Sequence, residues 1–451
     1  MRLRYLLAFA LFTSCTKELV NEQTPKAPIA KVTTTQIDKG TLTNIKMLYY
    51  QLLDGADQSA NGVIYYENHI IFSPANSNGY TSPIHLIKSN NAWALESAKY
   101  GDLMDRPRNT IKVTNGTVVW ANASKELSNF GSGNLYLSKT NPDKSLTWKK
   151  LSSRDAFYHY ATAGDIDNDG NPEIISYVGA ETESPEWLEV FGGPNYDKIE
   201  VTMPSAAEFE AALGFTKADK NKVGAGFSFG SITVANIDLT TSQNELVLTS
   251  TKALMNEYYS FIILNYDQNT KKFKITKIIK PSGLLLEYQM GVGDVKAADF
   301  NGDNNTDLVV TMGNHKTNEY SGVQVWLNDG KGNLIANKKK SKLYSKENKN
   351  IIFFSNIEVG KFRGHDCVFL HYEGTRYVPT IQNNLDLSPF LLISAGDDGG
   401  FTHLPELKVS GLVPTFMKGY FEKQNNVDVL RLIGMKDVGP NEFNLTDITI
   451  K

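Results

Sequence analysis

The stretch VKAADFNGDNNTDLVVTMG, residues 295–313, decides the fold because the chain repeats it. It places a loop rich in Asp and Asn, residues 299–307, directly before a run of β-branched and apolar residues. The segment YATAGDIDNDGNPEIISYVG, residues 160–179, has the same outline, with its loop at residues 165–173. Self-similarity at long spacing predicts a fold built from repeated structural units.

Five further segments repeat parts of this outline. Residues 231–250, 355–374 and 416–434 keep the apolar flanks around a loop, whereas residues 61–74 and 110–124 are strand–turn–strand patterns without the acidic loop. All copies together give seven units, and the loops of the last five begin roughly 60 to 70 residues apart. A unit of that length is too long for one hairpin and fits a four-stranded antiparallel sheet.

We therefore predict an all-β fold over residues 44–451, a seven-bladed β-propeller of four-stranded antiparallel blades. A ring of such sheets buries each blade against its neighbours and hides the edge strands. One segment differs. In residues 204–220, PSAAEFEAALGFTKADK, the Ala and Glu content and the apolar spacing predict a short helix with Ser205 as its N-cap, inserted in the third unit.

The overall composition excludes one broad class of partner. The chain has 451 residues, 41% of them hydrophobic, which is enough to bury a large core. Its 46 basic and 49 acidic residues give a formal net charge of −3. Because no excess of positive charge is present to neutralise phosphates, we predict no nucleic-acid binding.

The N-terminus predicts export. Residues 1–14 combine Arg2 and Arg4 with a short apolar stretch, which is typical of a secretory signal peptide and too short to span a bilayer. The following Cys15 resembles the lipidated cysteine of a bacterial lipobox, although Phe12 stands where that motif usually has Leu. An ordinary signal peptide ending near a cysteine is the alternative. Lipidation would make residues 15–43 a lipidated N-terminus and flexible tether, on the outer membrane or cell surface.

The first acidic loop predicts a calcium site. Its oxygen ligands alternate along the loop: Asp165, Asp167, Asp169, the backbone carbonyl of Asn171, and Glu173. Gly170 supplies a positive φ for the turn. Carboxylates so close together repel one another unless a cation lies between them, and hard oxygen ligands without His or Cys select Ca²⁺ over zinc.

The second loop matches the first position for position. Its ligands are Asp299, Asn301, Asp303, the carbonyl of Asn305, and Asp307. Asn304 replaces the glycine of the first loop, and Asn tolerates left-handed geometry. An EF-hand is not indicated, because the twelfth positions are Ser176 and Val310 and strand-like residues follow. A solvated Asx-rich turn without metal is the alternative for each loop.

Loops of the type Asp-Phe-Asn-Gly-Asp-x-x-x-Asp-Leu before a strand resemble FG-GAP/VCBS repeats, the calcium-binding repeats of integrin-α-type propellers and many bacterial surface proteins. The resemblance implies two calcium ions in this chain. A third, weaker site would use Asn236, Asp238, Thr240 and Glu245. In the next unit Lys361, Arg363 and His365 exclude calcium, and in the last unit the equivalent residues are Tyr420, Glu422, Gln424 and Asp428.

No catalytic signature stands out. The chain has seven histidines without metal-ligand spacing, at positions 69, 85, 159, 315, 365, 371 and 403, and Cys367 is expected to be a buried, inert thiol. The favoured hypothesis is a non-enzymatic surface module that binds an extracellular protein or glycan. The alternative is a propeller polysaccharide lyase or other glycan-processing enzyme. That alternative requires clustered titratable side chains in the axial funnel, for example His159, His315 or His371 beside an Arg or Tyr.

Overall fold

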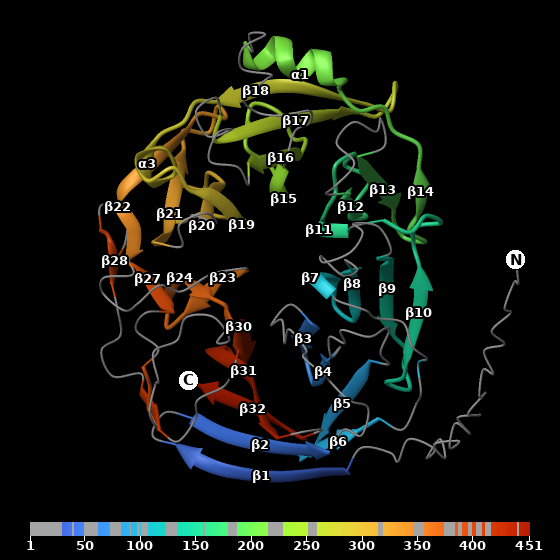
Figure 1. Cartoon of the computed structure of the whole chain (residues 1–451), viewed down its shortest axis with the longest axis vertical. Coiled ribbons are helices and arrows are strands. Elements are labelled where there is room, and N and C mark those ends of the chain that lie inside the picture. Colours follow the sequence, from blue (N-terminus) through green and yellow to red (C-terminus); the bar gives the residue numbers. More distant parts are fainter. Residues whose placement is uncertain are drawn as a thin grey trace, which may run out of the picture.

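The protein forms a closed ring of seven antiparallel sheets, as predicted (Figure 1). The computed structural model describes residues 29–37, 40–48, 62–72, 83–90, 92–96, 100, 107–122, 133–156, 158–178, 187–214, 229–250, 259–313, 319–345, 356–373, 384–386, 390–395, 399–402, 408–410, 416–439 and 442–451. The predicted signal peptide and Cys15 lie outside the described residues.

The first three blades follow the chain in order. Blade 1 contains β3 (Val63–Tyr66), β4 (His69–Phe72), β5 (Ile84–Ser89) and β6 (Ala92–Leu95). Blade 2 contains β7 (Pro107–Thr114), β8 (Thr117–Asn122), β9 (Leu135–Thr140) and β10 (Leu146–Lys150). Blade 3 contains β11 (Tyr158–Gly164), β12 (Glu173–Val178), β13 (Leu188–Gly192) and β14 (Asp197–Ile199). In each blade the first strand lies nearest the ring axis (Figure 1).

The next three blades repeat this arrangement. Blade 4 contains β15 (Phe229–Ala235), β16 (Glu245–Ser250), β17 (Phe261–Asp267) and β18 (Lys272–Ile279). Blade 5 contains β19 (Gly291–Ala298), β20 (Asp307–Gly313), β21 (Tyr320–Asn328) and β22 (Leu334–Ser345). Blade 6 contains β23 (Ile357–Phe362), β24 (His365–Leu370), β27 (Leu391–Ser394) and β28 (Phe401–Thr402). A separate two-stranded sheet pairs β26 (Asn384–Asp386) with β29 (Lys408–Ser410).

Blade 7 closes the ring with strands from both ends of the chain. Its inner strands are β30 (Phe416–Gln424), β31 (Val427–Gly439) and β32 (Glu442–Ile450), and β25 (Tyr372–Glu373) pairs with β30. The N-terminal strand β2 (Gly40–Leu48) then pairs antiparallel with β32, from Gly40 opposite Ile450 to Leu48 opposite Glu442, and β1 (Ile29–Ile37) lies outside it.

The N-terminal strands differ from the expected tether. All of β1 and the start of β2 fall within residues 15–43, whereas residues 15–28 lie outside the described part of the chain. Because β2 is held by backbone pairing with β32, its place in the ring does not require a periodic apolar pattern.

The helical insertion is confirmed. Helix α1 (Ala206–Leu213) links β14 to β15, and Ser205 caps it by accepting a hydrogen bond from the Glu208 N–H, with the Glu208 side chain returning to the Ser205 N–H. The helix ends at Gly214, whose φ of 71° is left-handed. A second, five-residue helix that the sequence did not predict, α3 (Gly283–Glu287), connects β18 to β19.

The core lies between blades rather than in one place. Ile64 of blade 1 packs in one cluster with Trp120 of blade 2, and Tyr177 of blade 3 shares another with Leu246 of blade 4. Inner strands approach so closely that a Cβ added at Gly360 would lie 2.5 Å from the Phe421 Cβ of the next blade. The ring is therefore held by many apolar interfaces between neighbouring blades.

Candidate functional site

Both strong acidic loops occupy the predicted position at the end of an inner strand. Asp165 directly follows β11 and Glu173 is the first residue of β12. In the same way, Asp299 follows β19 and Asp307 begins β20. No helix flanks either loop within the described residues, which confirms that neither is an EF-hand.

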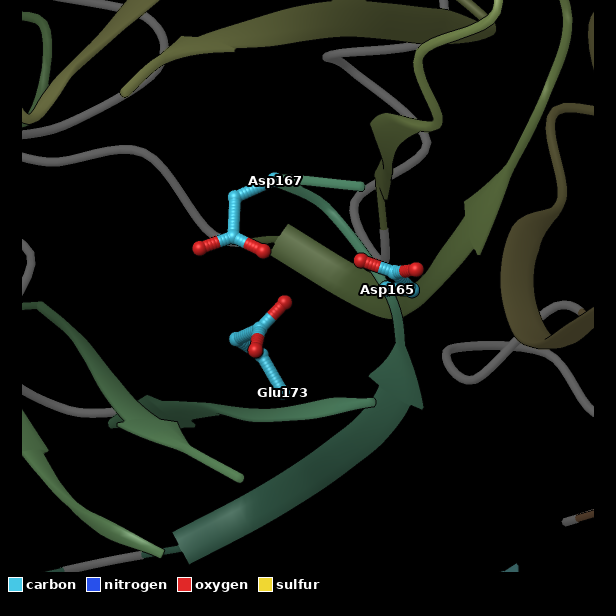
Figure 2. Close-up of side chains that lie close together, drawn as sticks. All are labelled: Asp165, Asp167 and Glu173. Carbon is cyan, nitrogen blue, oxygen red and sulfur yellow. The ribbon is translucent and has the colours of Figure 1, made fainter. Parts of the chain in front are cut away.

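The first loop gathers three of its predicted ligands. Carboxylate oxygens of Asp165, Asp167 and Glu173 all lie within 4.8 Å of one another. Figure 2 shows these three carboxyl groups around a common space, with Glu173 reaching it from the strand that follows the loop. Glu173 is 1% exposed, so bulk water does not solvate the charge of its carboxyl group.

The electrostatics of this cluster favour a cation. Burial, together with the neighbouring Asp167, Asp169 and Asp165, raises the pKa of Glu173 to about 7. Burial also raises the pKa of Asp167, with the charges of Asp169 and Asp165 acting in the same direction. A divalent ion would remove this repulsion, and an all-oxygen donor set fits calcium.

One predicted carboxylate of the first loop, that of Asp169, does not join the cluster. The Asp169 side chain is exposed, and its Oδ1 accepts hydrogen bonds from the backbone N–H and side-chain Nδ2 of Asn171, at 2.7 and 3.1 Å. Asp165 instead accepts from the Asp169 and Gly170 N–H groups at 3.1 and 2.9 Å. Asp169 thus shapes the loop, and the three grouped carboxylates carry the charge.

Each strong loop needs two left-handed residues. In the first loop these are Asn168 and Gly170, with φ of 60° and 87°. In the second they are Gly302 and Asn304, with φ of 80° and 66°. The loops therefore exchange Gly and Asn between their fourth and sixth positions. The sequence indicated only the sixth position.

The second loop is more spread out than the first. Asp299 accepts from the N–H groups of Gly302 and Asn304 at 2.7 and 2.9 Å. Asp303 accepts from the N–H of Asn305 at 2.8 Å and, through Oδ2, from the side-chain amides of Asn301 and Asn305. Within the described residues, the only group of three acidic side chains close enough to share an ion is that of the first loop.

In the second loop the acidic group that begins the strand is buried. Asp307 accepts from the N–H groups of Phe300 and Asn328 at 2.9 and 2.8 Å. Burial raises its pKa to about 6 despite these bonds. The residues present fit a calcium ion in donor type, with Asn301 and Asn305 supplying neutral oxygens.

The weaker third loop has two oxygens that lack partners. Among the described residues, no group donates to the buried Oδ1 of Asn236 or the buried Oε1 of Glu245. The other Glu245 oxygen accepts from the Ile237 N–H at 2.7 Å, and burial raises the pKa of Glu245. Unpaired buried acceptors of this kind fit a bound cation. The sequence alone had predicted only a weak calcium site in this loop.

One arrangement recurs in all three loops. The acidic residue that begins the second strand accepts from the N–H of the loop's second residue, in the pairs Ile166–Glu173, Ile237–Glu245 and Phe300–Asp307. The carbonyl of that second residue accepts from a side chain of the following blade, in the pairs Gln243–Ile166, Asn328–Ile237 and Ser394–Phe300. We call this arrangement the clasp. It fixes each loop to the next blade.

The loop of blade 6, for which the sequence excluded calcium, is a short turn through Arg363 and Gly364 between β23 and β24. Lys361 beside this turn pairs with Asp366 at 3.0 Å. In blade 7, Tyr420 donates to the Val63 carbonyl and Glu422 pairs with Arg431 at 3.2 Å. These side chains are thus engaged in contacts between strands and blades.

A second feature lies at the centre of the ring. Inner strands of blades 1, 2, 5, 6 and 7 line a cavity of about 240 Å³, which we call the axial cavity. Its polar lining includes Asn109, Lys112, Lys296, Glu358, His371 and Lys418. The sequence hypothesis named only His371 among these. A signal was present, because Lys296 and Glu358 are charged residues within inner strands whose neighbouring positions, Val295, Ala297, Ile357 and Val359, are apolar.

The histidines divide into separate environments. His371 is buried in the axial cavity, with its ring centroid 6.4 Å from that of Tyr420. His69 and His85 form a buried pair at 2.8 Å, and His365 is exposed and does not join His371. The remaining histidine side chains, at positions 159, 315 and 403, lie outside the described ones. Cys367 is buried, as predicted, and burial raises its thiol pKa to about 12.

Comparison with known proteins identifies no relative: no protein-family model matches the chain, and no curated protein is similar in sequence. The FG-GAP/VCBS resemblance of the loops stays a prediction, while the seven-bladed propeller is established by the structure. None of the helices described is long and apolar enough to cross a membrane.

Proposed function

We propose that the protein is a calcium-stabilised, lipid-anchored surface propeller that binds an extracellular protein or glycan. The observation that carries the proposal is the clasp, which fixes the acidic loops of blades 3, 4 and 5 to the blade that follows each. Loops held in this way offer a pre-organised face, which limits the entropy lost when a partner binds.

Calcium would complete this face rather than act chemically. In the first loop Asp165, Asp167 and Glu173 would hold the ion, and bound calcium would supply the positive charge that offsets the repulsion between their carboxylates. In the third loop Asn236 and Glu245 would gain the partner that their oxygens lack. Extracellular calcium is abundant enough to fill weak sites of this kind.

The anchor and the location are proposed from the sequence. Cys15 after a short apolar stretch would carry acyl chains and place the ring on the outer membrane or cell surface. Metabolic labelling with a clickable palmitate analogue tests this. We expect label on the wild type and none on Cys15→Ser; equal labelling of both would contradict the anchor.

The binding role is tested on arrays of extracellular-matrix proteins and polysaccharides, probed with fluorescent protein in calcium or in EDTA. We expect saturable binding to a small set of spots in calcium and a clear loss in EDTA. Absence of binding to any spot, or binding that is indifferent to calcium, would count against a calcium-ordered binding face.

A glycan-processing enzyme is the second candidate, because His371 and Tyr420 meet in the axial cavity. Their pKa shifts do not favour acid–base catalysis. Burial and the charge of Lys418 keep the pKa of His371 well below its usual range, and burial raises that of Tyr420 well above its own. Incubation with a panel of uronate polysaccharides decides the matter: growth of ultraviolet absorbance from unsaturated products would establish a lyase.

A further inference from the structure

The axial cavity contains two buried acceptor atoms without a partner. His371 is 4% exposed and Asn109 is 3% exposed, and both line the cavity. Among the described residues, nothing forms a hydrogen bond with His371 Nδ1 or with Asn109 Oδ1. Leaving a buried polar atom unpaired costs roughly 1–3 kcal/mol, so such atoms in a cavity point to something that binds there.

The tautomer of His371 follows from its other nitrogen. Nε2 lies 3.3 Å from the Gly419 carbonyl oxygen. A carbonyl only accepts, so Nε2 carries the proton and Nδ1 presents a lone pair. Protonation of Nδ1 is disfavoured, because burial and the charge of Lys418 lower the His371 pKa. Both unpaired atoms are therefore acceptors, and a ligand must bring donors to them.

The charges around the cavity add a second requirement. Lys112, Lys296 and Lys418 all line it and all act electrostatically on Glu358. A second carboxylate of the lining, Asp294, lies 3.9 Å from the Lys296 ammonium and also accepts hydrogen bonds from Ser231, Val295 and Ile357 at 2.8, 2.8 and 3.0 Å.

The two remaining acidic residues of the lining have other surroundings. Glu422 pairs with Arg431 at 3.2 Å, and Glu67 is exposed in the turn between β3 and β4. The three ammonium groups thus face two carboxyl groups, those of Glu358 and Asp294, and exceed them by one positive charge. This end of the cavity consequently attracts an anion.

We propose that the axial cavity binds a small hydroxylated carboxylate, such as a sugar acid. Its carboxylate would meet the lysines, and its hydroxyl groups would donate to His371 Nδ1 and Asn109 Oδ1. A volume of about 240 Å³ admits a small organic molecule. The site is independent of the acidic loops and of the anchor.

Other small solutes meet only part of these requirements. A neutral sugar has donors but no negative charge for the lysines. Acetate has the charge but no hydroxyl groups for the two acceptors. Water could donate to both acceptors but would leave the charge unbalanced.

Isothermal titration calorimetry with sodium glucuronate tests the proposal, with glucose and sodium acetate as matched ligands at the same ionic strength. We expect measurable binding of glucuronate and binding of the other two that is weaker by roughly tenfold or more. Glucuronate binding should weaken as salt rises. If no ligand binds, or if glucose or acetate binds as well as glucuronate, the proposal is wrong.

Variants locate the site. Lys296→Met should weaken glucuronate binding by roughly tenfold or more, because it removes a charged partner. Asn109→Leu should weaken it by removing an acceptor. Lys338→Met is the control, since Lys338 is exposed on β22 of the same blade as Lys296. Melting curves show which variants are folded. Glucuronate binding that survives both substitutions in folded protein would overturn the assignment.

This outcome is separable from the proposed surface function. Loss of partner binding in EDTA with intact glucuronate binding would concern only the loops. Absence of glucuronate binding with intact calcium-dependent partner binding would overturn only the assignment of the axial cavity.

Discussion

Asp165 and Asp169 belong to the same loop and have different surroundings. The carboxylate of Asp165 lies close to those of Asp167 and Glu173, whereas Asp169 is exposed and accepts a hydrogen bond from the Asn171 N–H. The sequence predicted both as calcium ligands, because side chains at alternate positions of a short loop cannot be distinguished from the sequence. Their separation depends on the left-handed turns at Asn168 and Gly170, which orient each carboxylate individually.

Calcium should stabilise the protein mainly through Asp165. We expect EDTA to lower the melting temperature of the wild type by several degrees, because ligand at a hundredfold excess over Kd contributes roughly 2.7 kcal/mol. Asp165→Ala should remove most of this difference, and the matched variant Asp169→Ala should keep more of it. Differential scanning fluorimetry measures each pair. An unchanged wild-type melting curve in EDTA would refute the calcium site.

The His69–His85 pair predicts acid sensitivity. Burial, followed by the neighbouring His69, lowers the pKa of His85 to about 3. Because the unfolded state takes up a proton near pH 6.5 and the folded state does not, stability is full above about pH 6.5 and is lost as pH falls towards 3.

Between pH 7 and 5 the loss from His85 should be roughly 1–2 kcal/mol. His85→Gln removes this titration, so the variant should lose less stability than the wild type over the same interval. Urea unfolding at the two pH values measures the difference. An equal loss of unfolding free energy in both proteins would show that His85 does not cause the loss of stability at acidic pH.

At the scale of single elements, the inner strands depend on close approach. Gly360 of β23 leaves room for Phe421 of β30, where a Cβ would come within 2.5 Å. We expect Gly360→Ala to destabilise the protein by roughly 1–3 kcal/mol through overpacking between blades 6 and 7. Lys361→Ala, at the exposed neighbouring position, should change stability little. Chemical denaturation measures the unfolding free energy of both variants. An unchanged unfolding free energy in Gly360→Ala would show that blades 6 and 7 can move apart at little cost.

Elements with a local signal were predictable. The run after the second acidic loop became β20, which is buried along its whole length, and Ser205 caps α1 as expected. Local capping and strand patterns suffice in such cases. Strand β1 had no such signal, because the polar segment that contains it owes its place to pairing with β2.

On the scale of the whole molecule, closure of the ring joins distant parts of the chain. The Nη1 nitrogen of Arg431 lies 3.5 Å from a carboxylate oxygen of Asp447, and the guanidinium group lies over the ring of Tyr65 in blade 1. Asp447 on β32 also accepts from Trp93 and Lys88 of blade 1, at 2.9 and 3.3 Å. Blades 7 and 1 are thus joined by buried polar contacts as well as by packing.

Removal of the N-terminal strands should weaken the entire ring. We expect deletion of residues 1–48 to lower the melting temperature markedly and promote aggregation, because β32 becomes an unpaired edge. Deletion of residues 1–28, which stops before β1, is the control and should leave the melting temperature nearly unchanged. Equal stability of the two truncated proteins would show that β1 and β2 do not close the ring.

The number of blades could be predicted because each blade carries its own copy of the pattern. The axial cavity could not, since His371, Lys418 and Asn109 come from segments separated by up to several hundred residues and meet only when the ring closes. The ring was predicted, but the strand pairing that closes it was missed for the same reason: pairing between β2 and β32 leaves no mark in either segment alone.

That pairing has a further consequence for the order of the chain. Because β2 and β32 lie side by side over nine residue pairs, the ring does not depend on where its polypeptide starts. A circular permutant that begins β2 at Gly40, links Lys451 to Gly40 through a short turn and opens at the turn between β9 and β10 would place its new ends within blade 2. The geometry of the seven blades, rather than the direction in which they are synthesised, would then define the molecule.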